Sequence, residues 1–176
     1  MLKAAFKYVS LTVLFFLLTL LQVSLLSMAS FFGATINGIF ILFFLIVFFE
    51  PKNQYYAGFF GVLMGGFCLD LISPYPFGIS IIALLIIYCL KKWADHFLVK
   101  EHITYIMMYF GILFCLAFLG FVGCLYLIHF LLGFEVSIGG PLLMNVLYNL
   151  FVACIVFFVY KNLVHENPIH NQLTLL

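Results

Sequence analysis

The stretch AGFFGVLMGGFCLDLISPYPFGIS, residues 57–80, decides the fold. It combines closely spaced glycines, a single carboxylate at Asp70 and a turn that contains Pro74 and Pro76. Apolar residues flank Asp70 on both sides, and an acid at that depth in a membrane costs about 2.5–3.5 kcal/mol on insertion scales. Some other part of the molecule must therefore offset the cost of burying Asp70.

The composition excludes a water-soluble globule. Of the 176 residues, 67% are hydrophobic and only 7% are charged, and the mean hydropathy is +1.30. Soluble domains carry about 25% charged residues. We therefore predict an all-α, polytopic membrane protein with almost no domain outside the bilayer. The basic residues form no clustered face of the kind that binds nucleic acid, so we expect no nucleic-acid partner.

Six apolar runs are expected to form six transmembrane helices, since about 20 residues cross the hydrocarbon core. The first run is longer than the apolar part of a signal peptide, so we interpret it as a retained helix. The fifth and longest run should tilt, or kink near Gly120 and Gly123. One domain would cover residues 1–161, and 162–176 would be a polar cytoplasmic tail. The expected spans are residues 8–28, 31–49, 56–73, 77–93, 103–132 and 141–161.

The lysines predict the orientation. All seven basic residues are lysine, and with six crossings they all fall on the side of the N-terminus. The opposite loops, around Ala29, Pro74 and Glu135, contain none. By the positive-inside rule, both termini are cytoplasmic. The polar segment 91–102 is then the longest candidate for a cytoplasmic contact, or else a solvated anchor attracted to anionic lipids.

Two interpretations of Asp70 compete. In the first, the carboxylate binds a cation, a proton or a polar substrate in a cavity, as intramembrane acids often do. In the second, it accepts hydrogen bonds from backbone donors of the turn over residues 75–80, at the positive end of the fourth helix. We favour the second, because the turn with Pro74 and Pro76 already supplies the geometry.

Small residues form a stripe on the third span. Ala57, Gly61 and Gly65 recur at every fourth position, and Gly66 lies beside them. Stripes of this kind let membrane helices approach closely. The stripe is either a groove for the helix of another protein or a packing face for this protein's own helices, and we favour the second.

Polar residues also occur within the first, second and sixth spans. Gln22 lies in the first, Thr35 and Asn37 in the second, and Asn145 and Asn149 one turn apart in the sixth. They could line a polar substrate pocket. Alternatively they form hydrogen bonds between helices, worth about 0.6 kcal/mol each on average. We favour the hydrogen bonds.

No pattern is typical of an enzyme. The five cysteines lie in apolar runs without a CxxC pair, and no histidine lies near them at zinc spacing. The segment from His165 to His170 resembles HExxH, but its histidines are one residue too far apart and Pro168 interrupts it. We therefore expect no catalytic residue, no metal and no cofactor.

The stretch 57–80 resembles the MreD family, the small multi-pass rod shape-determining membrane proteins of bacteria. Members of that family show a glycine-rich third span with an acid near its end, a proline-containing turn, then glycine and another apolar helix. The chain length, the six expected spans and the cytoplasmic termini agree with the family as well. The residues that carry the resemblance are Gly58, Gly61, Gly65, Gly66, Asp70 and the turn Ser73-Pro74-Tyr75-Pro76-Phe77-Gly78.

The resemblance implies a non-enzymatic scaffold of the cell-elongation machinery, which directs peptidoglycan synthesis from the bacterial inner membrane. The implied partners are MreC, the actin-like MreB and the RodA–penicillin-binding-protein synthase. The family is similar in architecture to the substrate-binding subunits of energy-coupling-factor vitamin importers, which gives an alternative function. Those subunits typically have an alanine-rich stripe on the first helix, whereas here Ala4 and Ala5 precede a span rich in leucine and phenylalanine.

Overall fold

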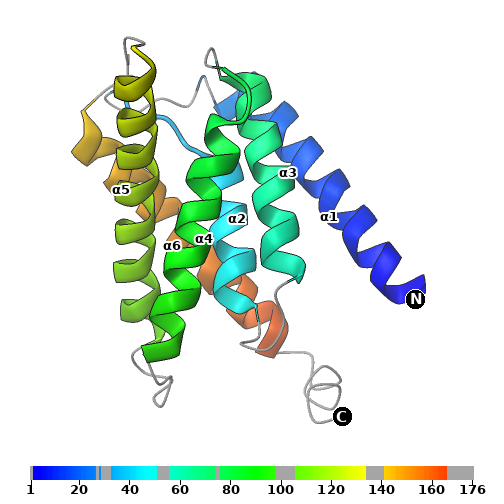
Figure 1. The fold of residues 1–176 in the computed structure, drawn as a ribbon. Helices are drawn as coiled ribbons and strands as arrows, with labels where there is room; N and C mark the ends of the chain where they lie inside the picture. Colours follow the sequence, from blue (N-terminus) through cyan, green and yellow to red (C-terminus); the bar gives the residue numbers. More distant parts are fainter. Residues whose placement is uncertain are drawn as a thin grey trace.

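The computed structural model describes residues 2–26, 28, 33–50, 56–73, 76–97, 106–133 and 141–165. The described part of the chain is almost entirely helical, which confirms the all-α prediction. Consecutive helices alternate in direction, so α1 begins and α6 ends at the same end of the bundle (Figure 1). We call this the α2–α3 end, because α2 ends and α3 begins there, and the opposite one the α3–α4 end. The elements are α1 (Leu2–Leu21) with a following π-helical turn η1 (Gln22–Leu26), α2 (Gly38–Phe49), α3 (Tyr56–Ile72), α4 (Ile79–Phe97), α5 (Ile106–Leu132) and α6 (Leu142–His165).

Helix length and composition mark the protein as membrane-associated but do not confirm six full-length spans. The helices α2 and α3 are apolar but shorter than a span, and α4 carries Lys91, Lys92 and Asp95 in its last two turns. Within the described residues, three stretches are long and apolar enough to cross a bilayer: Phe6–Leu25, Met107–Leu132 and Leu142–Asn162.

The prediction of a helix over residues 31–49 is wrong in its first part. Gly33 has a positive φ of 78°, which glycine adopts readily, and the chain stays non-helical through Asn37. The Asn37 side chain then caps α2, whose first residue is Gly38. The 12 residues of α2 extend over only about 18 Å at 1.5 Å per residue. The helix alone is therefore too short to cross about 30 Å of hydrocarbon.

The expected polar loop that begins at Lys91 is also wrong in its first part. The helix α4 continues to Phe97, and both Lys91 and Asp95 are buried in the bundle. Residues 98–102 lie outside the described residues.

Two further boundaries differ from expectation in the second half of the chain. The helix α6 extends to His165, into the segment 162–176 that we expected to be a tail. The helix α5 continues without interruption past Gly120 and Gly123, where we expected a possible kink.

The centre of the bundle is an aromatic ladder between α2 and α5. On both helices phenylalanines recur every fourth residue, and because the helices are antiparallel the two series meet ring by ring. The pairs are Phe40 with Phe118 (ring centroids 5.2 Å apart), Phe44 with Phe114 (5.2 Å) and Phe48 with Phe110 (5.1 Å), all edge to face. Such pairs contribute about 0.5–1.5 kcal/mol each beyond their area. The ladder fixes α2 as the innermost helix.

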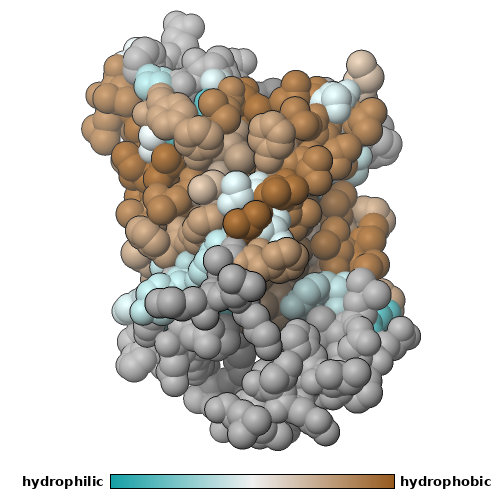
Figure 2. Space-filling model, turned by 90° about the vertical axis from the view of Figure 1, so that its right-hand side faces the viewer, coloured by the Kyte–Doolittle hydropathy of each residue, from teal (hydrophilic) through white to brown (hydrophobic). Residues whose placement is uncertain are grey.

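The helix α1 lies at the periphery. Figure 1 shows it inclined away from the other helices, and most of its large apolar side chains are exposed. Phe15 is the exception, since it is fully buried against α3 near Gly65. Figure 2 shows a broad apolar surface on this side of the molecule, with hydrophilic residues gathered toward its lower part. An apolar surface of this extent suits contact with lipid.

Candidate functional site

Asp70 holds the turn between α3 and α4. The backbone N–H of Gly78 donates to its Oδ2 at 2.7 Å, and the N–H of Ser80 donates to its Oδ1 at 2.9 Å. Both donors belong to the start of α4, where backbone N–H groups lack partners within the helix. The carboxylate is 5% exposed, so these two bonds and the positive helix end stabilise its charge. The predicted hydrogen bonding of Asp70 to the turn is confirmed.

Glycines bring α3 and α4 close enough for this arrangement. A Cβ atom at Gly66 would lie 2.6 Å from the Cα of Ile81, so no larger residue fits without moving the backbone of α4. Gly78 has a φ of 102°, which side-chain-bearing residues rarely adopt, and its carbonyl accepts the N–H of Ile82. Pro76 is exposed at the turn, and Pro74 lies outside the described residues.

The small-residue stripe of α3 packs against this protein's own helices. Gly65 faces Phe15 of α1, and a Cβ there would lie 3.3 Å from that ring. Gly61 faces α2 at an ordinary contact distance of 3.6 Å from Phe43. The interpretation as internal packing is therefore confirmed for these two glycines. Ala57 lies at the α2–α3 end, beside a groove described below.

Side-chain amides of α6 hold the non-helical segment before α2. The N–H of Thr35 donates to Asn145 Oδ1 at 3.0 Å, and the N–H of Asn37 donates to Asn149 Oδ1 at 2.6 Å. The Nδ2 of Asn149 donates back to the carbonyl oxygen of Thr35 at 2.9 Å. Because the two asparagines are one turn apart, their amides reach alternate residues of the segment.

Two further side chains complete this network at the start of α2. The N–H of Ile39 donates to Gln22 Oε1 at 3.2 Å, and the N–H of Phe40 donates to Asn37 Oδ1 at 3.0 Å. Irregular backbone is tolerated at membrane depth only where protein groups satisfy it. Gln22, Asn145 and Asn149 thus act as hydrogen-bonding groups between elements, as we favoured.

A small polar cavity lies at the α3–α4 end beside this network. It has a volume of about 330 Å³ and is lined by Thr35, Asn37, Ser73 and Ser80, with apolar side chains of α3 and α5. Ser80 is only 5% exposed, and within the described residues its hydroxyl has no hydrogen-bond partner. The cavity therefore offers a buried hydroxyl to a bound molecule or to water.

A different set of contacts lies at the α2–α3 end, where Glu50 follows α2. Its Oε1 accepts the N–H of Gly58 at 2.6 Å, and its Oε2 accepts the Tyr88 hydroxyl at 3.3 Å. Lys92 forms a salt bridge with the same oxygen at 2.8 Å. A Cβ at Gly58 would lie 2.5 Å from that carboxylate, so only glycine leaves room for it. Glu50 thus joins α2, α3 and α4.

Lys91 and Asp95 form a second buried ion pair at this end, one turn apart on α4. The Lys91 ammonium also donates to the carbonyl oxygen of Val47 at 2.8 Å, at the open end of α2. The Tyr109 hydroxyl of α5 donates to the other Asp95 oxygen at 3.4 Å. The pair therefore connects α4 with both α2 and α5.

Sequence reasoning missed these two ion pairs. No role was expected for Glu50, and Lys91, Lys92 and Asp95 were expected in the polar segment 91–102, of which residues 91–93 also belong to the expected fourth span. One signal was present, because Lys91 and Asp95 have the i,i+4 spacing that pairs side chains on one helix face. Nothing local links Glu50, which follows α2, with Lys92 of α4.

The remaining described residues form no candidate catalytic or metal site. The five cysteines are free, and within the described residues no three His, Cys, Asp or Glu side chains gather as metal ligands would. The candidate functional site is therefore the set of buried hydrogen bonds and ion pairs at the two ends of this all-α, membrane-associated bundle. The chain matches no protein-family model, no curated protein and no solved structure.

Proposed function

We propose that this protein is a non-enzymatic membrane scaffold of the bacterial cell-elongation machinery, which links MreC and other elongation proteins in the inner membrane. The proposal begins from the resemblance of residues 57–80 to the MreD family. The expected further partners are MreB and the RodA–penicillin-binding-protein synthase, and both termini are expected to be cytoplasmic.

The observation that carries the proposal is the α3–α4 hairpin. The residues of the resemblance belong to this hairpin. Asp70 accepts the backbone N–H groups of Gly78 and Ser80, which fixes the turn. Gly66 lets α3 approach the backbone of α4 closely at Ile81. A scaffold needs a face of fixed shape rather than a reactive group, and a hairpin held at its turn offers one.

The face that this hairpin offers to a partner is not the glycine stripe. The glycines face inward, whereas Phe59, Leu63, Phe67 and Leu71 recur every fourth residue on α3 and are each 43–58% exposed. We define these four side chains as the α3 ridge. Within the proposal, the α3 ridge contacts the single transmembrane helix of MreC.

Co-purification with MreC tests the proposal. The tagged protein, extracted from bacterial membranes in a mild detergent, should retain MreC. Alanine at both Leu63 and Phe67 should lower the retained MreC at an unchanged protein level, since these side chains are exposed. Leucine at both Gly61 and Gly65 should instead lower the protein level itself, because the space is filled by this protein's own helices. Failure of the unaltered protein to retain MreC contradicts the scaffold.

The polar cavity favours one second candidate, the substrate-binding subunit of a vitamin importer. A volume of about 330 Å³ is within the range of small-molecule sites, about 300–1,000 Å³. The Ser80 hydroxyl, which has no hydrogen-bond partner among the described residues, gives such a molecule a donor and an acceptor. Depletion of single vitamins from a panel by the purified protein separates the two functions. Tight binding of one vitamin, lost in Ser80→Val, supports the importer and contradicts the scaffold.

A further inference from the structure

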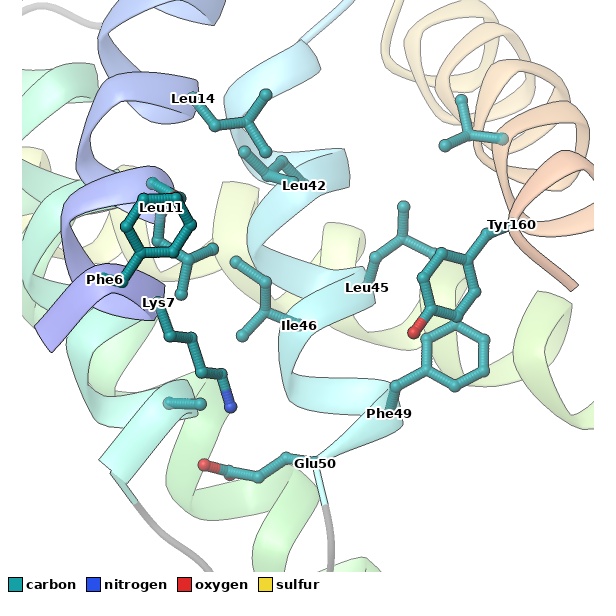
Figure 3. Close-up of a pocket in the computed structure, with 13 residues that line it drawn as sticks. Phe6, Lys7, Leu11, Leu14, Leu42, Leu45, Ile46, Phe49, Glu50 and Tyr160 are labelled. Atoms are coloured by element: carbon teal, nitrogen blue, oxygen red, sulfur yellow. The ribbon is translucent and has the colours of Figure 1, made fainter. Parts of the chain in front are cut away.

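A second hollow lies at the α2–α3 end of the bundle. It is an apolar groove of about 630 Å³ between α1 and α6, with α2 as its floor. Figure 3 shows Leu11 and Leu14 of α1 on one side, Leu42 and Ile46 on the floor, and Tyr160 of α6 on the other side.

The groove arises from how the outer helices pack. The helix α1 packs mainly on α3 and α2, and α6 packs mainly on α5 and α2, so part of α2 is left open between them. Its floor residues Leu42, Leu45 and Ile46 are only partly buried, although α2 is the innermost helix elsewhere. An apolar chain could therefore lie along α2 in this groove.

One end of the groove is positively charged. Lys7 and Glu50 both line that end, and Figure 3 shows the Lys7 ammonium pointing toward Glu50. The charge of Glu50 is already compensated by Lys92 at 2.8 Å and by the Gly58 N–H. Lys7 is exposed and forms no salt bridge with any acid among the described residues. The charge left for a ligand at this end is therefore positive.

We propose that this groove binds one anionic phospholipid, with an acyl chain along α2 and its phosphate at Lys7. Basic sites between membrane helices on the cytoplasmic side bind anionic head groups. A helix from another protein fits the walls less well, because close helix contacts in membranes use small residues. The walls consist mainly of leucine, isoleucine and phenylalanine, with Ser10 and Ala57 as the small exceptions. The site does not depend on the proposed scaffold function.

Native mass spectrometry of the full-length protein in detergent tests this site. The protein is titrated with phosphatidylglycerol or with the zwitterionic phosphatidylcholine. We expect one phosphatidylglycerol to bind in preference to phosphatidylcholine. Lys7→Gln should weaken phosphatidylglycerol binding about five-fold, because a lysine near an anionic surface contributes about 1 kcal/mol to binding. Leu14→Trp, which places an indole in the groove from an exposed position, should weaken both lipids.

Lys161→Gln is the matched control, since this lysine does not line the groove and should leave the binding unchanged. The melting temperature of each variant shows whether it is folded. Equal binding of both lipids, or unchanged phosphatidylglycerol binding in folded Lys7→Gln, overturns the proposal. So does a cross-link from Ser10→Cys to another protein's helix that excludes phosphatidylglycerol. Loss of MreC without loss of the lipid would contradict only the scaffold.

Discussion

Both ends of the bundle contain buried polar groups, but these groups are paired differently at each end. At the α3–α4 end, side-chain oxygens of Asp70, Asn145 and Asn149 accept hydrogen bonds from backbone N–H groups at the start of α4 and in the non-helical segment before α2. At the α2–α3 end, the carboxylates of Glu50 and Asp95 form salt bridges with lysines of α4. Both sets are buried, so neither relies on water for its partners.

The two ends of the bundle have different polar groups that need partners. A non-helical backbone carries unpaired N–H and C=O groups, and each costs several kcal/mol in hydrocarbon unless a neighbour satisfies it. The amide of Asn149 suits that task because it donates and accepts at once, whereas the Asp70 carboxylate only accepts. At the α2–α3 end, the described charges connect one helix to another, and Glu50 and Lys91 also pair with backbone groups at helix ends. Four substitutions test this division.

Asp95→Leu should be the most destabilising change. It leaves the Lys91 ammonium, whose side chain is 3% exposed, without its carboxylate. Breaking a buried pair in this way costs about 3–5 kcal/mol. Thermal unfolding in detergent measures the loss. The double change Lys91→Met with Asp95→Leu is the control and should recover most of it, because two apolar residues leave no buried charge. If the double variant is as unstable as the single one, ion pairing is not what stabilises this end.

At the α3–α4 end, Asp70→Leu should lower the free energy of unfolding by about 2–4 kcal/mol. Two backbone N–H groups lose their acceptor, and each loss costs about 1–2 kcal/mol. Gly78 is only half-buried, so water can partly replace one of the lost bonds. Asp70→Asn keeps one acceptor oxygen and should accumulate to a higher level with a higher melting temperature. An Asn variant as poor as the Leu variant would mean that the charge, and not the hydrogen bonding, is essential.

Asn149→Leu tests the hydrogen bonds between α6 and the segment before α2, and it should lower the free energy of unfolding by about 1–2 kcal/mol. The change orphans the N–H of Asn37 and the carbonyl of Thr35, but hydrogen bonds between membrane helices average only about 0.6 kcal/mol. Asn162→Leu is a matched control on the same helix, at an exposed position outside the network. Equal melting temperatures for the two variants would show that the segment before α2 does not need α6.

Gly66→Ala should have the smallest effect of the four, a loss of about 1 kcal/mol. Overpacking against the α4 backbone costs about 1–3 kcal/mol, and the better helix propensity of alanine returns up to about 1 kcal/mol. Gly61→Ala has ordinary contact distances and should be neutral or slightly stabilising. The difference between their melting temperatures measures how tightly α3 and α4 must approach. A Gly66→Ala variant as stable as the wild type would contradict the close approach.

Local contacts were predictable from the sequence, and distant ones were not. The Asp70 hydrogen bonds could be predicted because carboxylate and donors lie within ten residues across a proline turn. The partners of Asn145 and Asn149 lie 110 and 112 residues away, and a periodic pattern does not identify them. The helix start at Gly38 was missed for the same reason. An apolar run predicts a helix, but here capping by Asn37 and support from α6 favour a non-helical segment.

The hold of α6 on the segment before α2 has a consequence for synthesis in the membrane. Translation produces Thr35 and Asn37 more than a hundred residues before the asparagines that satisfy their backbone groups. The backbone groups of Thr35 and Asn37 therefore lack these partners when they leave the ribosome, and they gain them only once α6 has been made. A chain truncated before Asn145 would keep the aromatic ladder of α2 and α5, but the segment before α2 would lose the amides that bind it.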